Sequence, residues 1–172
     1  MKKVLTLILI IISLNISAQS RSEKKAAKKQ QQQEQYEKLK TIVESGSYEY
    51  EALWANPMGS PRINLATNPN YLRYQKDSMD IFFPYFGVSQ TVNTYNTRDI
   101  GINFSGSPQD YKVSYDDDKM RITIKFSGKS ESENLDFTIV VYGESSAKLN
   151  VSSSGRQSIS YDGRLFEYKK TS

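Results

Sequence analysis

The chain of 172 residues is predicted to be a mostly β protein: an antiparallel meander closed as a sandwich or an open barrel, with one N-terminal helix packed on it. Two observations predict this class. From Ser47 onward, apolar and polar residues alternate in short runs, which is the period of a half-buried strand. Short polar or Gly/Pro-containing loops separate the runs, with no helical pattern between them, and this favours antiparallel pairing.

The first residues have the pattern of a targeting signal. Lys2 and Lys3 precede the apolar run Val4–Ile12, and Ser17-Ala18 offers small residues for cleavage. A bilayer-spanning helix needs about 20 apolar residues, so this run is too short to be one. We therefore expect residues 1–18 to be a cleaved signal peptide and the protein to be periplasmic or secreted. The chain has no cysteine, which excludes a lipid-modified cysteine at the cleavage site, and disulfides as well.

Residues 19–35 form a polar tether, with the lysine-rich run Arg21–Lys29 followed by Gln30–Gln33. Without an apolar residue larger than alanine, this segment has no core of its own. Two interpretations are open: a spacer, which is the simpler one, or electrostatic contact with an anionic membrane surface or polysaccharide. Residues 21–40 hold seven basic and three acidic side chains, whereas residues 41–172 hold 14 basic and 16 acidic. We thus expect no nucleic-acid binding, and membrane contact at most through the basic arm.

Residues 36–170 are predicted to be a single β-rich domain. An apolar stripe at helical spacing, followed by Gly46, predicts a helix over about residues 30–45. Nine or ten strands follow, with an uninterrupted meander from Tyr111 onward. Asp116–Lys119 is expected to be a hairpin turn, and Asp162-Gly163 to be a type I′ turn into a last strand.

The densest aromatic cluster lies at residues 82–87, and it is expected to be a strand driven into a corner. Pro84 cannot donate to a sheet ladder, and Gly87 permits a turn. The chain also contains 12 tyrosines, whose rings combine an apolar body with a polar rim. We name as ligand-binding candidates Phe82, Tyr85, Phe86 and Tyr95. The alternative is that these rings pack the core and anchor the corner, with Phe86→Ala costing about 3–5 kcal/mol.

The amino-acid composition excludes most kinds of catalytic site and metal site. Histidine and cysteine are both absent, and no nucleophile or phosphate-loop motif occurs. No catalytic residue, metal site or cofactor is therefore predicted. The run Asp116–Asp118 fits a solvated turn better than a calcium loop. Two acid pairs, Glu49 with Glu51 and Asp77 with Asp80, supply carboxylates for glycoside hydrolysis, but the first pair fits an exposed strand face better.

Two stretches carry a family resemblance. Phe83-Pro84-Tyr85-Phe86-Gly87 matches a Leu/Phe-Pro-Tyr-Phe-Gly motif, and Ser152–Gly163 matches a closing pattern that includes Arg156-Gln157, Ile159 and Tyr161. On these residues the chain resembles a family of uncharacterised, exported, mostly β domains common in Bacteroidetes. The resemblance implies a domain of unknown function and transfers no catalytic residue. Asp77-Ser78-Met79 also fits a short acidic-hydroxyl-aliphatic sequon, and the resemblance to exported Bacteroidetes proteins implies O-glycosylation at Ser78.

Together these observations predict a non-enzymatic periplasmic binding or scaffold module with an aromatic-lined surface. The expected partner is a small apolar ligand, a glycan or an envelope protein. The alternative is a carboxylate-dependent hydrolase acting on glycans. An aromatic, charge-poor surface favours binding, whereas two acids facing across a cleft favour hydrolysis.

Overall fold

A computed structural model describes residues 2–87, 101–130 and 133–169, with side chains from residue 21 onward except at residue 144. The chain divides into two compact units, Met1–Glu34 and Gln35–Ser172, and each is described by itself. Within the described residues, no helix has the length and apolarity that a membrane crossing requires.

The N-terminal helix α1 runs over Lys2–Glu44. It ends as predicted: Gly46 adopts a left-handed φ of 66°, and the Gly46 amide donates to the Val43 carbonyl at 3.2 Å. The predicted start near Gln30 is wrong, because the helix continues without a break to Lys2. The preceding residues include no proline or glycine and many good helix formers. Within the second unit, Tyr36, Leu39 and Val43 are buried in the core.

Ten strands form one antiparallel sheet in the described part of the chain. The first meander consists of β1 (Ser47–Pro57), β3 (Tyr71–Gln75), β4 (Ser78–Phe83) and β5 (Ile102–Gly106), with the short β2 (Ile63–Asn64) pairing β1. The second consists of β6 (Gln109–Asp116), β7 (Arg121–Lys129), β8 (Asn134–Val141), β9 (Ser146–Ser153) and β10 (Ile159–Glu167), with the 3-10 turn η2 (Gly143–Ser145) before β9. The pairing of β1 with β10 joins the two, in the order β5-β4-β3-β1-β10-β9-β8-β7-β6.

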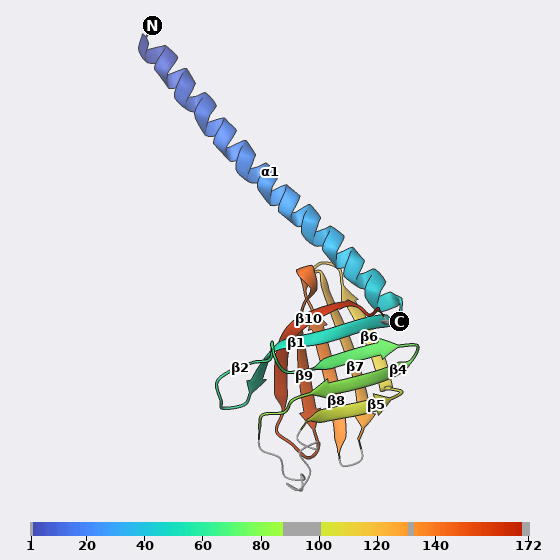
Figure 1. Cartoon of the computed structure of the whole chain (residues 1–172). Helices are drawn as coiled ribbons and strands as arrows, with labels where there is room; N and C mark the ends of the chain where they lie inside the picture. The colour runs from blue at the N-terminus through green and yellow to red at the C-terminus, as the bar shows by residue number, and fades with distance from the viewer. Residues whose placement is uncertain (1, 88–100, 131–132, 170–172) are drawn as a thin grey trace. The chain divides into compact units, whose positions relative to one another are not determined.

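The sheet curls on itself into a half-barrel, so the mostly β, antiparallel prediction is confirmed. Figure 1 shows β1, β4 and β5 crossing β7 and β8 at a steep angle. Side chains connect the two arms: the rings of Tyr74 in β3 and Tyr111 in β6 stack at 4.8 Å, and Phe104 in β5 lies over Gly128 in β7. A Cβ at Gly128 would lie 2.6 Å from that ring, so glycine permits the approach. Of the two closures left open, the structure has one curled sheet rather than two facing sheets.

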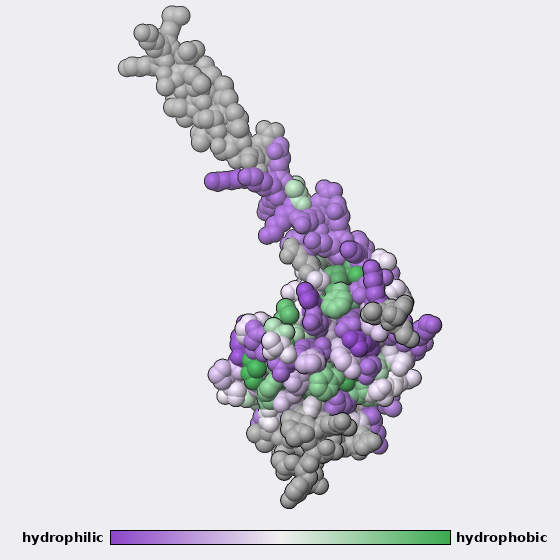
Figure 2. Space-filling model, in the orientation of Figure 1, coloured by the Kyte–Doolittle hydropathy of each residue, from purple (hydrophilic) through white to green (hydrophobic). Residues whose placement is uncertain are grey.

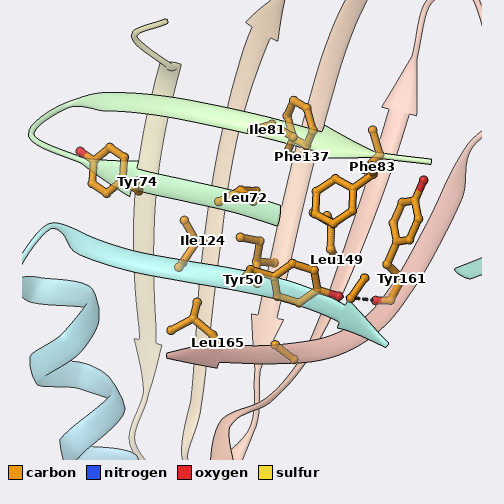
Figure 3. Close-up of a cluster of buried hydrophobic side chains, with 14 of the residues drawn as sticks. Tyr50, Leu72, Tyr74, Ile81, Phe83, Ile124, Phe137, Leu149, Tyr161 and Leu165 are labelled. Carbon is orange, nitrogen blue, oxygen red and sulfur yellow. Dashed lines mark hydrogen bonds between the residues drawn. The ribbon is translucent and has the colours of Figure 1, made fainter. Parts of the chain in front are cut away.

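The core fills the concave side, and its largest fully buried side chains are aromatic (Figure 3). The Phe83 ring lies between Tyr50 and Tyr161, with centroids 5.9 and 4.9 Å away, and the Tyr50 hydroxyl donates to the Tyr161 carbonyl at 2.9 Å. Burial raises the pKa values of the Tyr50 and Tyr161 phenols well above the usual range for tyrosine. These tyrosines are therefore neutral core residues with satisfied hydroxyls.

The predicted type I′ turn at Asp162-Gly163 is wrong, because β10 runs straight through it. Gly163 instead faces Ala52, next to a bulge at which the register of β1 shifts. A Cβ at Gly163 would lie 2.0 Å from the Glu51 carbonyl oxygen. Glycine is required there because the two backbones approach closely. Turns also favour glycine, so the sequence pattern predicted a turn at a position where the strand continues. The Asp116–Lys119 turn between β6 and β7 is confirmed.

Candidate functional site

The aromatic corner after β4 is held by the C-terminal stretch that carried the second half of the family resemblance. The Tyr161 hydroxyl donates to the Pro84 carbonyl at 2.9 Å, and the Tyr85 hydroxyl donates to the Gln157 carbonyl at 3.0 Å. Strand β4 ends at Phe83, directly before Pro84, as predicted. The residues joined by these two hydrogen bonds are 77 and 72 positions apart in the sequence. They meet because the curl brings the end of β4 beside the start of β10.

A buried ion pair lies at the same corner. The Arg156 Nε is 2.8 Å from the Glu133 Oε1, and only 5% and 2% of the two side chains are exposed. Arg156 also donates to the Gly101 carbonyl at 3.0 Å, and its guanidinium carbon lies 5.2 Å from the Tyr85 ring centroid. The Ser153 hydroxyl donates to the other Glu133 oxygen. We call Glu133, Arg156 and Tyr85 the corner lock. It links three segments of the chain, and its contacts are those of a structural cluster that stabilises the corner.

The four predicted ligand-binding residues have different surroundings. Tyr85 is buried, and burial raises the pKa of its phenol even though Arg156 lowers it in part. Phe86 is only half-buried against the core, whereas Phe83 is fully buried, so we expect truncation of Phe83 to cost more than truncation of Phe86. Tyr95 lies outside the described residues. Phe82 is half-buried on the outer face of β4, opposite to Phe83. Of the three described candidates, Phe82 is the one whose ring is on the outside of the sheet.

The chain bends at Gly87, as predicted, and the reason for glycine there is space. A Cβ there would lie 2.6 Å from the Tyr85 hydroxyl oxygen, so glycine leaves room for the buried phenol. Its φ is not in the left-handed region, and the need is for space.

The outer face of β3, β4 and the end of β10 gathers aromatic rings around one arginine. The guanidinium carbon of Arg73 lies 4.0 Å from the Tyr71 ring centroid and 5.5 Å from that of Tyr168. The Tyr71 and Phe82 rings are paired across β3 and β4 at 6.3 Å. We call Tyr71, Arg73, Phe82 and Tyr168 the aromatic–arginine face. Sequence reasoning singled out only Phe82, because register between strands decides which rings become neighbours.

Carboxylates neutralise the arginines on this side of the sheet. Glu49 accepts from Arg73 at 3.0 and 3.4 Å, and Glu51 accepts from Arg164 at 2.8 Å. The predicted acid pair Glu49 and Glu51 is thus committed to two different arginines on one strand face. This arrangement supplies no free pair of acids flanking a substrate.

Four further acidic residues lie beside polar or basic side chains. Asp77 accepts from the Tyr74 hydroxyl at 2.9 Å, while Asp80 faces Arg73 across the β3–β4 ladder. Asp116 pairs with Lys119 and Arg121, and Asp117 accepts from the Tyr36 hydroxyl and Lys40. The hydrogen bond from Tyr36 is the main reason that the pKa of Asp117 is lowered. Among residues 2–87, 101–130 and 133–169, no three acidic side chains gather in a way that could hold a metal ion.

Ser78 is exposed at the start of β4. Accessibility is one requirement of the O-glycosylation that the family resemblance implies, so that modification stays a prediction.

Comparison with known proteins identifies the family. The model for a domain of unknown function, DUF4251, matches residues 30–165. A crystal structure of a DUF4251 family protein from Bacteroides eggerthii is similar in fold, with a TM-score of 0.55 and 16% identity over 77% of this chain and 87% of that one. At this identity the likeness concerns the fold alone. No curated protein matches the chain.

The predicted membership of a family of uncharacterised, mostly β domains is confirmed, while the Pro-Tyr-Phe-Gly motif and the distribution in Bacteroidetes stay predictions. The match covers the last part of α1 and nearly all of the half-barrel, including the corner lock and most of the aromatic–arginine face. The chain therefore belongs to the DUF4251 family of domains of unknown function.

Proposed function

We propose that this protein is an exported binding module of the periplasm that catalyses no reaction and contacts an envelope protein through the aromatic–arginine face. The proposal has three parts: the compartment, the mode of action and the chemistry of the partner. The observation that carries it is the Arg73 guanidinium, which stacks on one half-buried tyrosine ring and lies close to a second on the outside of the sheet.

The compartment follows from the N-terminal pattern. Lys2-Lys3, the apolar run Val4–Ile12 and Ser17-Ala18 have the order of a signal peptide. A periplasmic protein without disulfides depends on its own core for stability, and the half-barrel has an extensive one.

The composition of the face supports recognition of a protein. Tyrosine, phenylalanine and arginine are enriched in the buried centres of protein interfaces, and a few such residues carry most of the binding energy. Arg73 is held by two hydrogen bonds to Glu49, so little side-chain entropy remains to be lost on binding.

The charge balance also favours a protein partner. The arginines of this side are paired with carboxylates, and Asp80 opposite Arg73 adds a further negative charge, so the surface has no excess positive charge with which to attract a polyanion. A surface of rings and paired charges fits a partner with a similar mixture of groups. A small apolar ligand requires a concave site instead, and the concave side is occupied by core side chains.

Site-specific photo-crosslinking in the native host tests the proposal. A photoreactive amino acid replaces Phe82 in one strain and Tyr142, an exposed tyrosine outside the aromatic–arginine face, in another. We expect one discrete protein adduct from position 82 and none from position 142. A crosslinker at position 168 should give the same adduct as the one at position 82. Adding Tyr71→Ser should abolish that adduct, while the circular dichroism spectrum of the protein stays unchanged.

Three outcomes contradict the proposal. Adducts from position 142 that equal those from position 82 indicate nonspecific collisions. A glycan adduct at position 82 replaces the protein partner with a sugar, and release of reducing ends by the purified protein would support the hydrolase alternative.

A further inference from the structure

The strongest charge asymmetry outside the half-barrel lies on the exposed part of helix α1. Residues 21–31 are all exposed, and this stretch is almost entirely hydrophilic (Figure 2). It contains five basic residues, Arg21, Lys24, Lys25, Lys28 and Lys29. Their spacing is i, i+3, i+4, i+7 and i+8, which is the spacing of one helix face.

The continuous helix converts this run into a surface. At 3.6 residues per turn, the five basic positions occupy an arc of about 140° over about 12 Å of helix length. Glu23 and Glu34 project on the opposite side, so acidic residues do not interrupt the arc. We call these five residues the basic face. In a disordered tether the same charges would point in all directions, so the helical conformation is what creates the face.

We propose that the basic face binds the surface of an anionic phospholipid membrane by electrostatic attraction alone. The proposal goes beyond the binding function of the half-barrel and is independent of it. Lysine is a compact point charge that suits phosphate headgroups and needs no directional hydrogen bonds. A straight helix presents its basic face to a plane, so all five charges approach a flat bilayer together.

Two features favour a lipid surface over an anionic polysaccharide, and a third indicates how the helix would bind it. Residues 21–35 contain no aromatic side chain on which a sugar ring could stack. They contain no apolar side chain larger than alanine, so insertion into the acyl region is not expected and adsorption is reversible. The basic face also begins only nine residues after the apolar run Val4–Ile12, which we expect to engage the membrane during export.

The rest of the chain does not compete for the same surface. Residues 41–172 carry 14 basic and 16 acidic side chains. A body with a slight negative excess is not attracted to anionic lipid, so adsorption depends on the helix. This makes the contribution of the basic face separable by mutation.

The test is sedimentation of the protein, purified as it accumulates in its host, with vesicles. One set contains about 30 mol% phosphatidylglycerol in phosphatidylcholine and the other contains phosphatidylcholine only, both at about 50 mM salt. We expect binding to the anionic vesicles only and its loss at about 500 mM salt, where the Debye length is only a few ångströms.

Three variants separate the basic face from net charge. Changing four helix lysines to glutamine should weaken binding about 600-fold, since each basic residue near the surface contributes about fivefold; the positions are Lys24, Lys25, Lys28 and Lys29. A matched control changes four exposed lysines of the half-barrel to glutamine and should bind as the wild type does; the positions are Lys112, Lys125, Lys129 and Lys148. A third variant, K24Q/K28Q/A27K/Q30K, keeps the net charge but moves two positive charges off the basic face. It should bind about 25-fold more weakly than the wild type.

The overturning results are equally specific. Equal binding to both kinds of vesicle means that an apolar segment, not the basic face, attaches the protein. Equal losses in the helix and half-barrel variants mean that net charge alone matters. Absence of binding to phosphatidylglycerol vesicles, with retention on a column of anionic polysaccharide, assigns the face to a polysaccharide instead.

Discussion

Breaking the corner lock should destabilise the protein more than any exposed ion pair does. Arg156→Met removes the guanidinium and keeps most of the side-chain volume. Glu133 is then left as a buried carboxylate, 2% exposed, whose remaining described partner is the Ser153 hydroxyl. Removing one partner of a buried pair costs about 3–5 kcal/mol, because the remaining charge has lost both its hydration and its counter-ion.

A double-mutant cycle distinguishes pairing from packing. Glu133→Leu with Arg156→Met replaces both charges by apolar groups, which is often nearly neutral. The Gly101 carbonyl still loses its donor in the double variant, which costs about 1 kcal/mol. We therefore expect the double variant to be more stable than R156M and the coupling energy to be at least about 2 kcal/mol.

Urea unfolding followed by the fluorescence of Trp54, the only tryptophan, measures these free energies. The expected loss for R156M corresponds to a lowering of Tm on the order of 10–15 °C in a domain of this size. Arg164→Met is the matched control, because the Arg164–Glu51 pair is 55% and 38% exposed and its loss should cost less than about 1 kcal/mol. If R156M matches R164M, or if the two single effects simply add, the corner lock is not a coupled pair.

Three other predictions follow from the fold. Gly163→Ala should unfold the protein or lower its free energy of unfolding in urea by more than about 3 kcal/mol, because the added Cβ meets the neighbouring backbone. Gly143→Ala, with open space around it, should leave that free energy unchanged. Equal stability of the two variants would contradict the argument that glycine is needed beside the bulge. Tyr161→Phe should lower the free energy of unfolding by about 1–2 kcal/mol, because the Pro84 carbonyl loses its donor. An unchanged unfolding midpoint would mean that this hydrogen bond does not stabilise the corner. Burial raises the pKa of Tyr74 to about 12 and raises the pKa values of several other core tyrosines, so their contribution to stability should be complete below pH ~10 and lost as the pH rises toward 12. Ionisation of these core tyrosines should accompany the loss of β structure, and their ionisation near pH ~10 with the fold intact would refute the argument.

Local patterns were sufficient for most of the architecture. Alternation of polar and apolar residues determines which face of a strand is buried, so the mostly β class, the meander from Tyr111 onward and the end of β4 at Pro84 could all be predicted. Gly46 likewise marked the end of α1, because a left-handed C-terminal residue has a strong preference for glycine.

Glycine at position 163 shows where local patterns fail. Turns and tight backbone contacts select the same residue type for different reasons, and only the pairing of β1 with β10 reveals which reason applies. Glu133 is a second case. It follows a polar loop, where nothing local distinguishes a buried carboxylate from a solvated one.

The sequence by itself determined the strand content, the position of the corner, the charge separation between arm and body, and the absence of histidine and cysteine chemistry. Only the tertiary structure decided that the sheet is a single half-barrel and that the Pro84 and Arg156 stretches meet. It also decided that Tyr71, Arg73 and Phe82 share an outer face. The physical reason is that composition and periodicity act within one strand, whereas register and curl depend on contacts between residues far apart in the chain.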